Sequence, residues 1–220
     1  MITLLKQIPL KILCSQPVMF DANIFMVGIE NRQSDPNCSF ENMKDVYMIP
    51  IFESFSQIFI HQMVYDELDN EAKAFMNTYI GKNVIIVQDK KLYGKDPLFT
   101  TIFNDIANHE RVQYSLGSSK DRGEVYSLAY AVYHNINYFS SKEITVDDIA
   151  KELETLQNIE VITFDIIILL AYIYHMSNGD TSKNKALKSI YKRYCEDVIK
   201  RHKLPHTLRE YFIASEKYIK

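Results

Sequence analysis

The sequence predicts an α/β fold in which helices cover both faces of a central parallel sheet. Short apolar runs rich in β-branched residues alternate along the chain with longer segments of helical periodicity. Alternation at this spacing favours parallel strands joined by right-handed crossovers. The chain has 220 residues, of which 47% are hydrophobic, and this is enough for one core of ordinary size.

Five short runs carry the composition of strands. The run Val84–Val87 is continuous and β-branched, which is typical of a strand covered on both faces. The predicted strands are 17–20, 58–60, 84–87, 136–140 and 159–163.

Helices are predicted between these strands. The clearest is 121–135, where Val125, Leu128, Ala129 and Val132 repeat at helical spacing. The others are 64–80, 98–109, 145–156 and 165–176. We expect one domain over 1–178, with a polar, irregular insertion near 30–55. Residues 179–220 are expected to extend it as basic helices separated near Pro205.

Composition and motifs exclude several classes of protein. Cys14, Cys38 and Cys195 are far apart, which favours neither disulfides nor a zinc site and fits a reducing cytoplasm. The apolar stretch 166–174 is about half the length of a membrane span, so we expect a buried helix and no membrane. A phosphate-binding loop, a nucleophile elbow and a dinucleotide fingerprint are all absent.

Charge is unevenly distributed along the chain. Residues 181–220 hold eleven Lys or Arg and four Asp or Glu, a net charge of +7, and the remaining residues carry −10. Such asymmetry is expected if the body binds cations and the tail meets a polyanion, although a solvated helical face explains it equally well. Candidate contacts to nucleic acid are Lys188, Lys192, Arg193, Lys200 and Arg201. Tyrosines at helical spacing could stack on bases, but packing is their commoner use.

Three acids are candidates for a metal site. Asp21 follows the first predicted strand, Glu67 lies in the helix after the second, and Glu124 begins the helix 121–135. Two unit charges about 5 Å apart repel by about 3 kcal/mol at an effective dielectric of 20, and a divalent cation removes that cost. Oxygen-only ligands favour Mg²⁺ or Mn²⁺ over zinc.

Each acid also has a structural explanation. Asp121 and Glu124 have the spacing of a helix cap, and the acidic turn around Glu67 could simply be solvated. Asp21 is the least ordinary of the three, because a lone Asp that ends an apolar strand is poorly explained by solvation.

The order and context of these acids resemble the PIN-domain family. The opening strand with its terminal Asp, the V-x-x-E-L block, the G-E-x-x-x-x-A-x-A helix and the closing strand and helix all have counterparts here. They are VMFDANIFM (18–26), IFIHQMVYDEL (58–68), DRGEVYSLAYA (121–131) and IEVITFDIIILL (159–170). INYFSSKE (136–143) occupies the place of the family's last strand and its acidic tip, and the resemblance covers about residues 16–178.

The resemblance implies a three-layer α/β/α nuclease domain in which Asp21, Glu67 and Glu124 bind Mg²⁺ or Mn²⁺, with Asp121 as an auxiliary ligand. It also implies hydrolysis of RNA, single-stranded RNA as substrate, an antitoxin partner and a homodimer. The last strand departs from the family, because Ser and Lys stand where acids are usual. The auxiliary residues expected near the site are Asn23, Ser140, Ser141, Lys142 and Glu143.

This departure keeps two alternatives open. The first is a catalytically inactive PIN fold that binds RNA or acts as a scaffold. The second is a structure-specific DNA nuclease, since related folds process DNA flaps.

Overall fold

The computed structural model describes residues 10–26, 40–89, 91–112, 122–141, 144–196, 199–200 and 203–215. The chain forms two compact units. The first, which we call the sheet unit, takes Pro17–Met26 and Gln57–Thr163. The second, the helical unit, is drawn from Met1–Gln16, Val27–Ser56 and Phe164–Lys220.

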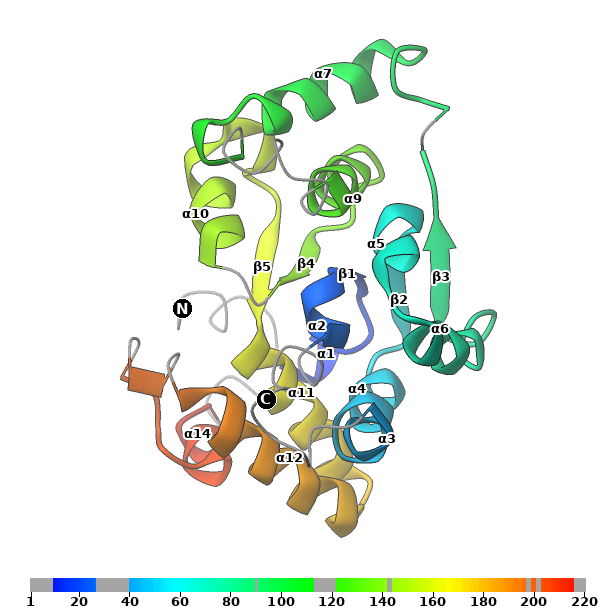
Figure 1. Ribbon diagram of the computed structural model, residues 1–220. Coiled ribbons are helices and arrows are strands. Elements are labelled where there is room, and N and C mark those ends of the chain that lie inside the picture. The colour runs from blue at the N-terminus through cyan, green and yellow to red at the C-terminus, as the bar shows by residue number, and fades with distance from the viewer. Residues whose placement is uncertain are drawn as a thin grey trace. The chain divides into compact units, whose positions relative to one another are not determined.

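The sheet unit is built on five parallel strands, so the predicted α/β class is confirmed. Figure 1 shows the strands side by side in the order β3-β2-β1-β4-β5. In the central strand, Met19 is paired with Phe59 of β2 and with Phe139 of β4. The bounds are β1 Pro17–Phe20, β2 Gln57–His61, β3 Val84–Val87, β4 Tyr138–Ser141 and β5 Glu160–Thr163. Each strand lies where the sequence predicts one.

Both faces of the central strands are buried. On one face, Met19, Phe139 and Val161 join a core with helices α7, α9 and α10, which are Pro97–Ala107, Arg122–Tyr133 and Ile144–Glu152. The alternate positions Val18 and Phe20 are also fully buried. Burial on both sides explains why these strands are continuously apolar rather than alternating with polar residues.

One predicted helix is divided in the structure. The sequence predicts a single helix over 64–80, but α5 is Gln62–Glu67 and α6 is Asn70–Asn77. The Asp69 carboxylate accepts a 2.8 Å hydrogen bond from the Ala72 backbone N–H and caps α6. An Asp that bonds the backbone in this way starts a new helix rather than continuing the old one. The sheet unit also contains α2, Ala22–Met26, and the short η3, Glu154–Leu156.

The helical unit corrects the prediction of an irregular segment near 30–55. From Phe40 onward this segment is helical, as α3 Phe40–Met43, the π-helical η2 Lys44–Met48 and α4 Ile49–Ser54. Tyr47, Ile51 and Phe52 are buried, so the polar residues that suggested a loop lie beside an apolar face that packs. The other helices are α1 Leu10–Leu13, α11 Phe164–Ser177, α12 Thr181–Tyr194 and α14 Leu208–Ser215.

Helix α11 is the centre of the helical unit, as expected for its apolar sequence. Every residue from Phe164 to Ile173 is buried. The Tyr211 hydroxyl on α14 donates a 3.0 Å hydrogen bond to the buried Asp165 carboxylate, so this acid is paired rather than stranded in the core. No helix in the described ranges is long and apolar enough to cross a membrane.

A charged cluster fixes the start of α12. The Asp180 carboxylate accepts a 3.1 Å hydrogen bond from the Lys183 backbone N–H, and the Lys183 ammonium lies 3.1 Å from the same carboxylate. Lys183 also donates to Glu53 of α4, which lies within the segment 30–55 that was predicted as an insertion. These bonds from Lys183 lower the pKa of Asp180 from the ordinary 3.8 to about 2.

Because this pKa is lower in the folded chain, the contribution of Asp180 to stability is present above about pH 3.8 and is lost as the pH falls towards about 2. Asp180→Asn keeps a good capping residue but removes the charge. We therefore expect a smaller loss of thermal stability between pH 4 and pH 2 in the variant, followed by circular dichroism. An identical acid loss in both proteins would contradict this assignment.

Candidate functional site

The strand order defines a switch point at the carboxyl ends of β1 and β4. From β1 the chain proceeds to β2 and β3 on one side, and then to β4 and β5 on the other. In open parallel sheets, ligands bind in the crevice at such a reversal. Asp21 directly follows β1, and Ser141 ends β4. Two residues predicted for the site therefore lie at the switch point.

The structure joins Asp21, Asn23 and Ser141 in one buried polar cluster. The Ser141 hydroxyl lies 3.4 Å from Asp21 Oδ2, and the Asn23 amide donates a 3.1 Å hydrogen bond to Ser141 Oγ. The Ala22 backbone N–H donates to Asp21 Oδ1 at 2.7 Å. Asp21 is only 6% exposed, so its carboxylate is held by these donors rather than by solvent. Capping of the short helix α2 is a structural role that the same bonds serve.

Ser140 lies beside this cluster but faces the other way. Consecutive strand residues point to opposite faces of a sheet, so Ser140 and Ser141 diverge. Ser140 is fully buried, and its hydroxyl oxygen has no hydrogen-bond partner among the described residues. Lys142 and Glu143, which were also predicted for this site, lie outside the described residues.

Two helices of the sheet unit place the Glu67 carboxylate beside Gly123, the residue that precedes Glu124. Glu67 is the last residue of α5, and Glu124 lies in the first turn of α9. A Cβ atom added to Gly123 would lie 2.9 Å from Glu67 Oε1 and 3.2 Å from Val64 Cγ2. The helices therefore approach closely at Gly123, and the Glu67 carboxylate occupies the space that a larger residue would need. Asp121 lies outside the described residues.

The carboxylates of Asp21, Glu67 and Glu124 are suitable ligands for a hard cation, but within the described residues they do not form a complete coordination site. Carboxylate oxygens are the donors that Mg²⁺ and Mn²⁺ prefer. In the part of the chain that the structure describes, no group of three or more His, Cys, Asp or Glu side chains could hold a metal ion. Glu67 is an exposed residue at the end of α5, whereas Asp21 is buried.

A buried His61–Asp89 pair lies at the ends of β2 and β3, and the sequence analysis did not identify it. His61 Nε2 is 2.9 Å from Asp89 Oδ1, and both side chains are 0% exposed. His61 Nδ1 accepts a 3.1 Å hydrogen bond from the Met63 N–H. The imidazole also stacks on Tyr126 of α9, with ring centroids 5.4 Å apart. Asp89 follows an apolar strand as Asp21 does, and that pattern could have identified it.

The tyrosines of α9 are used mainly in packing. Tyr126 contacts His61 and Phe103, and the Tyr133 hydroxyl donates a 3.0 Å hydrogen bond to Asp96. Burial, with nearby Asp89, raises the pKa of Tyr126 and of Tyr130. These contacts therefore favour a packing role for Tyr126, Tyr130 and Tyr133 over stacking on bases.

The predicted basic surface is present on α12. Lys188, Lys192 and Arg193 are exposed, and the Lys188 ammonium lies 5.5 Å from the centre of the Tyr172 ring. Lys200 is also exposed, but it forms a 2.7 Å ion pair with Glu196. Arg201 lies outside the described residues. We call Lys188, Lys192 and Arg193 the α12 basic face.

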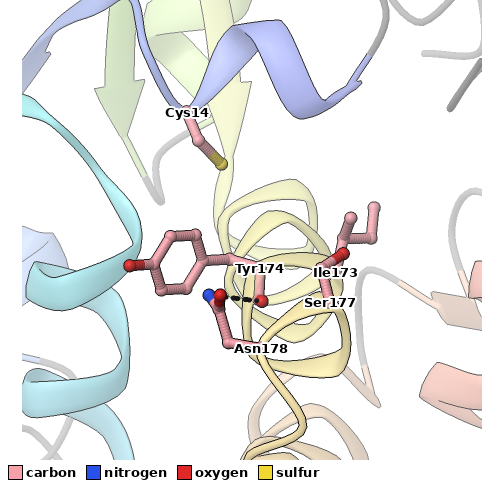
Figure 2. Close-up of a pocket in the computed structure, with 5 residues that line it drawn as sticks. All are labelled: Cys14, Ile173, Tyr174, Ser177 and Asn178. Atoms are coloured by element: carbon pink, nitrogen blue, oxygen red, sulfur yellow. Dashed lines mark hydrogen bonds between the residues drawn. The ribbon is translucent and has the colours of Figure 1, made fainter.

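The helical unit contains a cavity of about 240 Å³. Figure 2 shows its lining, which comes from Cys14 and from the C-terminal part of α11. Burial raises the pKa of the Cys14 thiol to about 12, so the thiol is not a nucleophile at neutral pH. The lining contains no acid or cation, and its residues are Cys14, Ile173, Tyr174, Ser177 and Asn178. The lining therefore offers no carboxylate to a metal ion.

Comparison with known proteins gives no family for this chain. No protein-family model, no curated protein and no solved structure matches it. The case for a function therefore depends on the residues at the sheet edge.

Proposed function

We propose that this protein is a metal-dependent ribonuclease of the PIN type. The observation that carries the proposal is the buried cluster of Asp21, Asn23 and Ser141 at the switch point of an all-parallel sheet. Burying a carboxylate costs free energy, and buried carboxylates are common in catalytic sites. The α/β fold and the order of the acids along the chain agree with this proposal.

The roles of the residues follow from their surroundings. Asp21, Glu67 and Glu124, with Asp121, would hold Mg²⁺ or Mn²⁺, which activates water and neutralises phosphate charge when bound. Ser141 orients Asp21 through its hydrogen bond, and Asn23 holds Ser141 by donating to its hydroxyl oxygen. Gly123 leaves the space that the Glu67 carboxylate needs beside α9.

RNA is the proposed substrate, and the α12 basic face is the proposed contact to its phosphates. Exposed Lys and Arg side chains bind a nucleic acid backbone without reading its sequence. A toxin role with an antitoxin partner and a homodimer are proposals that the family resemblance alone supports. A cytoplasmic location is a proposal that the three widely spaced cysteines support.

A second candidate is a noncatalytic RNA-binding protein with the same fold. Two observations favour it: serines rather than acids end β4, and the described acids do not form a group able to hold a metal. A metal-binding experiment separates the candidates, because only the nuclease requires Asp21 as a ligand.

The first prediction concerns Asp21. We expect purified protein with Mn²⁺ to cleave single-stranded RNA, and Asp21→Asn to lower the rate by 100-fold or about 3 kcal/mol of activation free energy. The assay measures product on a denaturing gel, with a DNA flap as the comparison substrate. Equal cleavage by the variant would indicate a contaminant, and faster cleavage of the flap would favour the DNA nuclease alternative.

The second prediction concerns Gly123. Gly123→Ala improves helix propensity by roughly 1 kcal/mol, but its methyl group displaces the Glu67 carboxylate. We expect stability to change little, while Mn²⁺-dependent cleavage falls at least 10-fold. Ala129→Gly on the same helix is the matched control, since it lowers propensity without approaching Glu67. Full activity of Gly123→Ala would exclude Glu67 from the site.

The third prediction concerns salt. Each phosphate contact to a single strand contributes about 0.7 to the slope of log K against log salt, so replacing Lys188, Lys192 and Arg193 with Gln should lower the slope by about 2. Fluorescence anisotropy with labelled RNA measures this slope. Lys200→Gln is the control, because its ammonium is already paired with Glu196. Equal slopes for the triple variant and the wild type would remove α12 from the RNA interface.

A further inference from the structure

We propose that the His61–Asp89 pair is a positioning device that holds α5 against α9 and so sets the spacing between Glu67 and Glu124. The inference rests on the proposed function for the importance of that spacing, and on the described contacts for the role of the pair. Neither residue touches the reacting groups, because both side chains are 0% exposed. His61 and Asp89 must therefore act on the spacing of Glu67 and Glu124 by positioning helices α5 and α9.

The imidazole of His61 is joined to four elements at once. It ends β2, and its Nδ1 caps α5 by accepting the Met63 N–H at 3.1 Å. Its Nε2 reaches Asp89, two residues beyond the end of β3. Its ring face stacks on Tyr126 of α9, with planes only 12° apart. Glu67 lies at the far end of α5, and Glu124 lies half a turn before Tyr126 on α9.

The hydrogen bonds also fix the protonation of the ring. Because Nδ1 accepts from the Met63 N–H, it carries no proton, and the single ring proton is on Nε2. Nε2 therefore donates to Asp89 Oδ1. This tautomer can cap α5 through Nδ1 and donate to Asp89 through Nε2 at the same time. Asp89 therefore selects the tautomer whose Nδ1 can accept the Met63 N–H.

A purely structural role is the alternative, and the energetics argue against it. Asp89 Oδ2 is buried and has no hydrogen-bond partner within the described ranges. A buried acid is a costly way to fill a core, and an apolar residue would stabilise the fold as well or better. The hydrogen bond that Asp89 accepts from His61 Nε2 explains why an acid occupies this position.

The test uses Mn²⁺ binding to the full chain, measured by calorimetry without RNA. Asp89→Ala removes the acceptor of His61, and His61→Phe keeps the stacked ring but loses both nitrogens. We expect each to weaken Mn²⁺ affinity by about 10-fold or more, as loss of partners that orient metal ligands commonly does. Asp89→Asn retains an oxygen acceptor and should stay within about 3-fold of the wild type, because a neutral hydrogen bond preserves the geometry.

Val146→Ala is the matched control for general destabilisation. Val146 is a fully buried residue of α10, so its truncation leaves a cavity in the same unit without touching α5. We expect this variant to lose stability and to keep its Mn²⁺ affinity. Unchanged affinity in Asp89→Ala, or an equal loss in Val146→Ala, would overturn the positioning role.

Hydrogen exchange of peptides covering α5 separates this inference from the proposed function. Faster exchange in α5 is expected for Asp89→Ala and not for Asp89→Asn or Val146→Ala. If the wild type binds no Mn²⁺, the nuclease proposal fails, and exchange alone decides whether the pair holds α5. Equal exchange in all four proteins would reject the pair as a positioning device.

Discussion

The backbone hydrogen bonds that place β1 between β2 and β4 determine which polar side chains of the sheet unit become neighbours. Both faces of the central strand are buried by packed side chains, and the polar residues of the cluster lie where the strands end. Asp21 follows β1, and Ser141 ends β4 next to it. His61 and Asp89 occupy the corresponding positions on β2 and β3. One topological constraint therefore gathers polar side chains from four strands along a single edge of the sheet.

The polar groups on this edge differ in what they can do. Asp21 accepts hydrogen bonds on both of its carboxyl oxygens, so the position of this group is fixed. Glu67 ends α5, and its carboxylate fills the space beside Gly123. In the proposed metal site, a divalent cation would offset the repulsion between these carboxylates.

Much of the fold could be predicted from the sequence, since β-branched runs and helical periodicity reflect burial directly. The apolar α11 is one case, because every residue from Phe164 to Ile173 is buried. The continuous run Val84–Val87 correctly predicted a strand, but its expected burial on both faces was wrong, because β3 is an edge strand and Ile85 is 40% exposed. The break at Asp69 was missed because helical periodicity continues on both sides of the cap. The helices after Phe40 were missed because their polar residues obscured a narrow buried stripe.

The candidate site was only partly predictable. An acid after an apolar strand identified Asp21, but the link between Asp89 and His61 depends on which strands become neighbours. Their pairing has a practical consequence. Since one ring nitrogen of His61 holds a proton and the other does not, their nitrogen-15 resonances should be well separated in a nuclear magnetic resonance spectrum. A single imidazole thus offers a spectroscopic reporter of the state of this sheet edge.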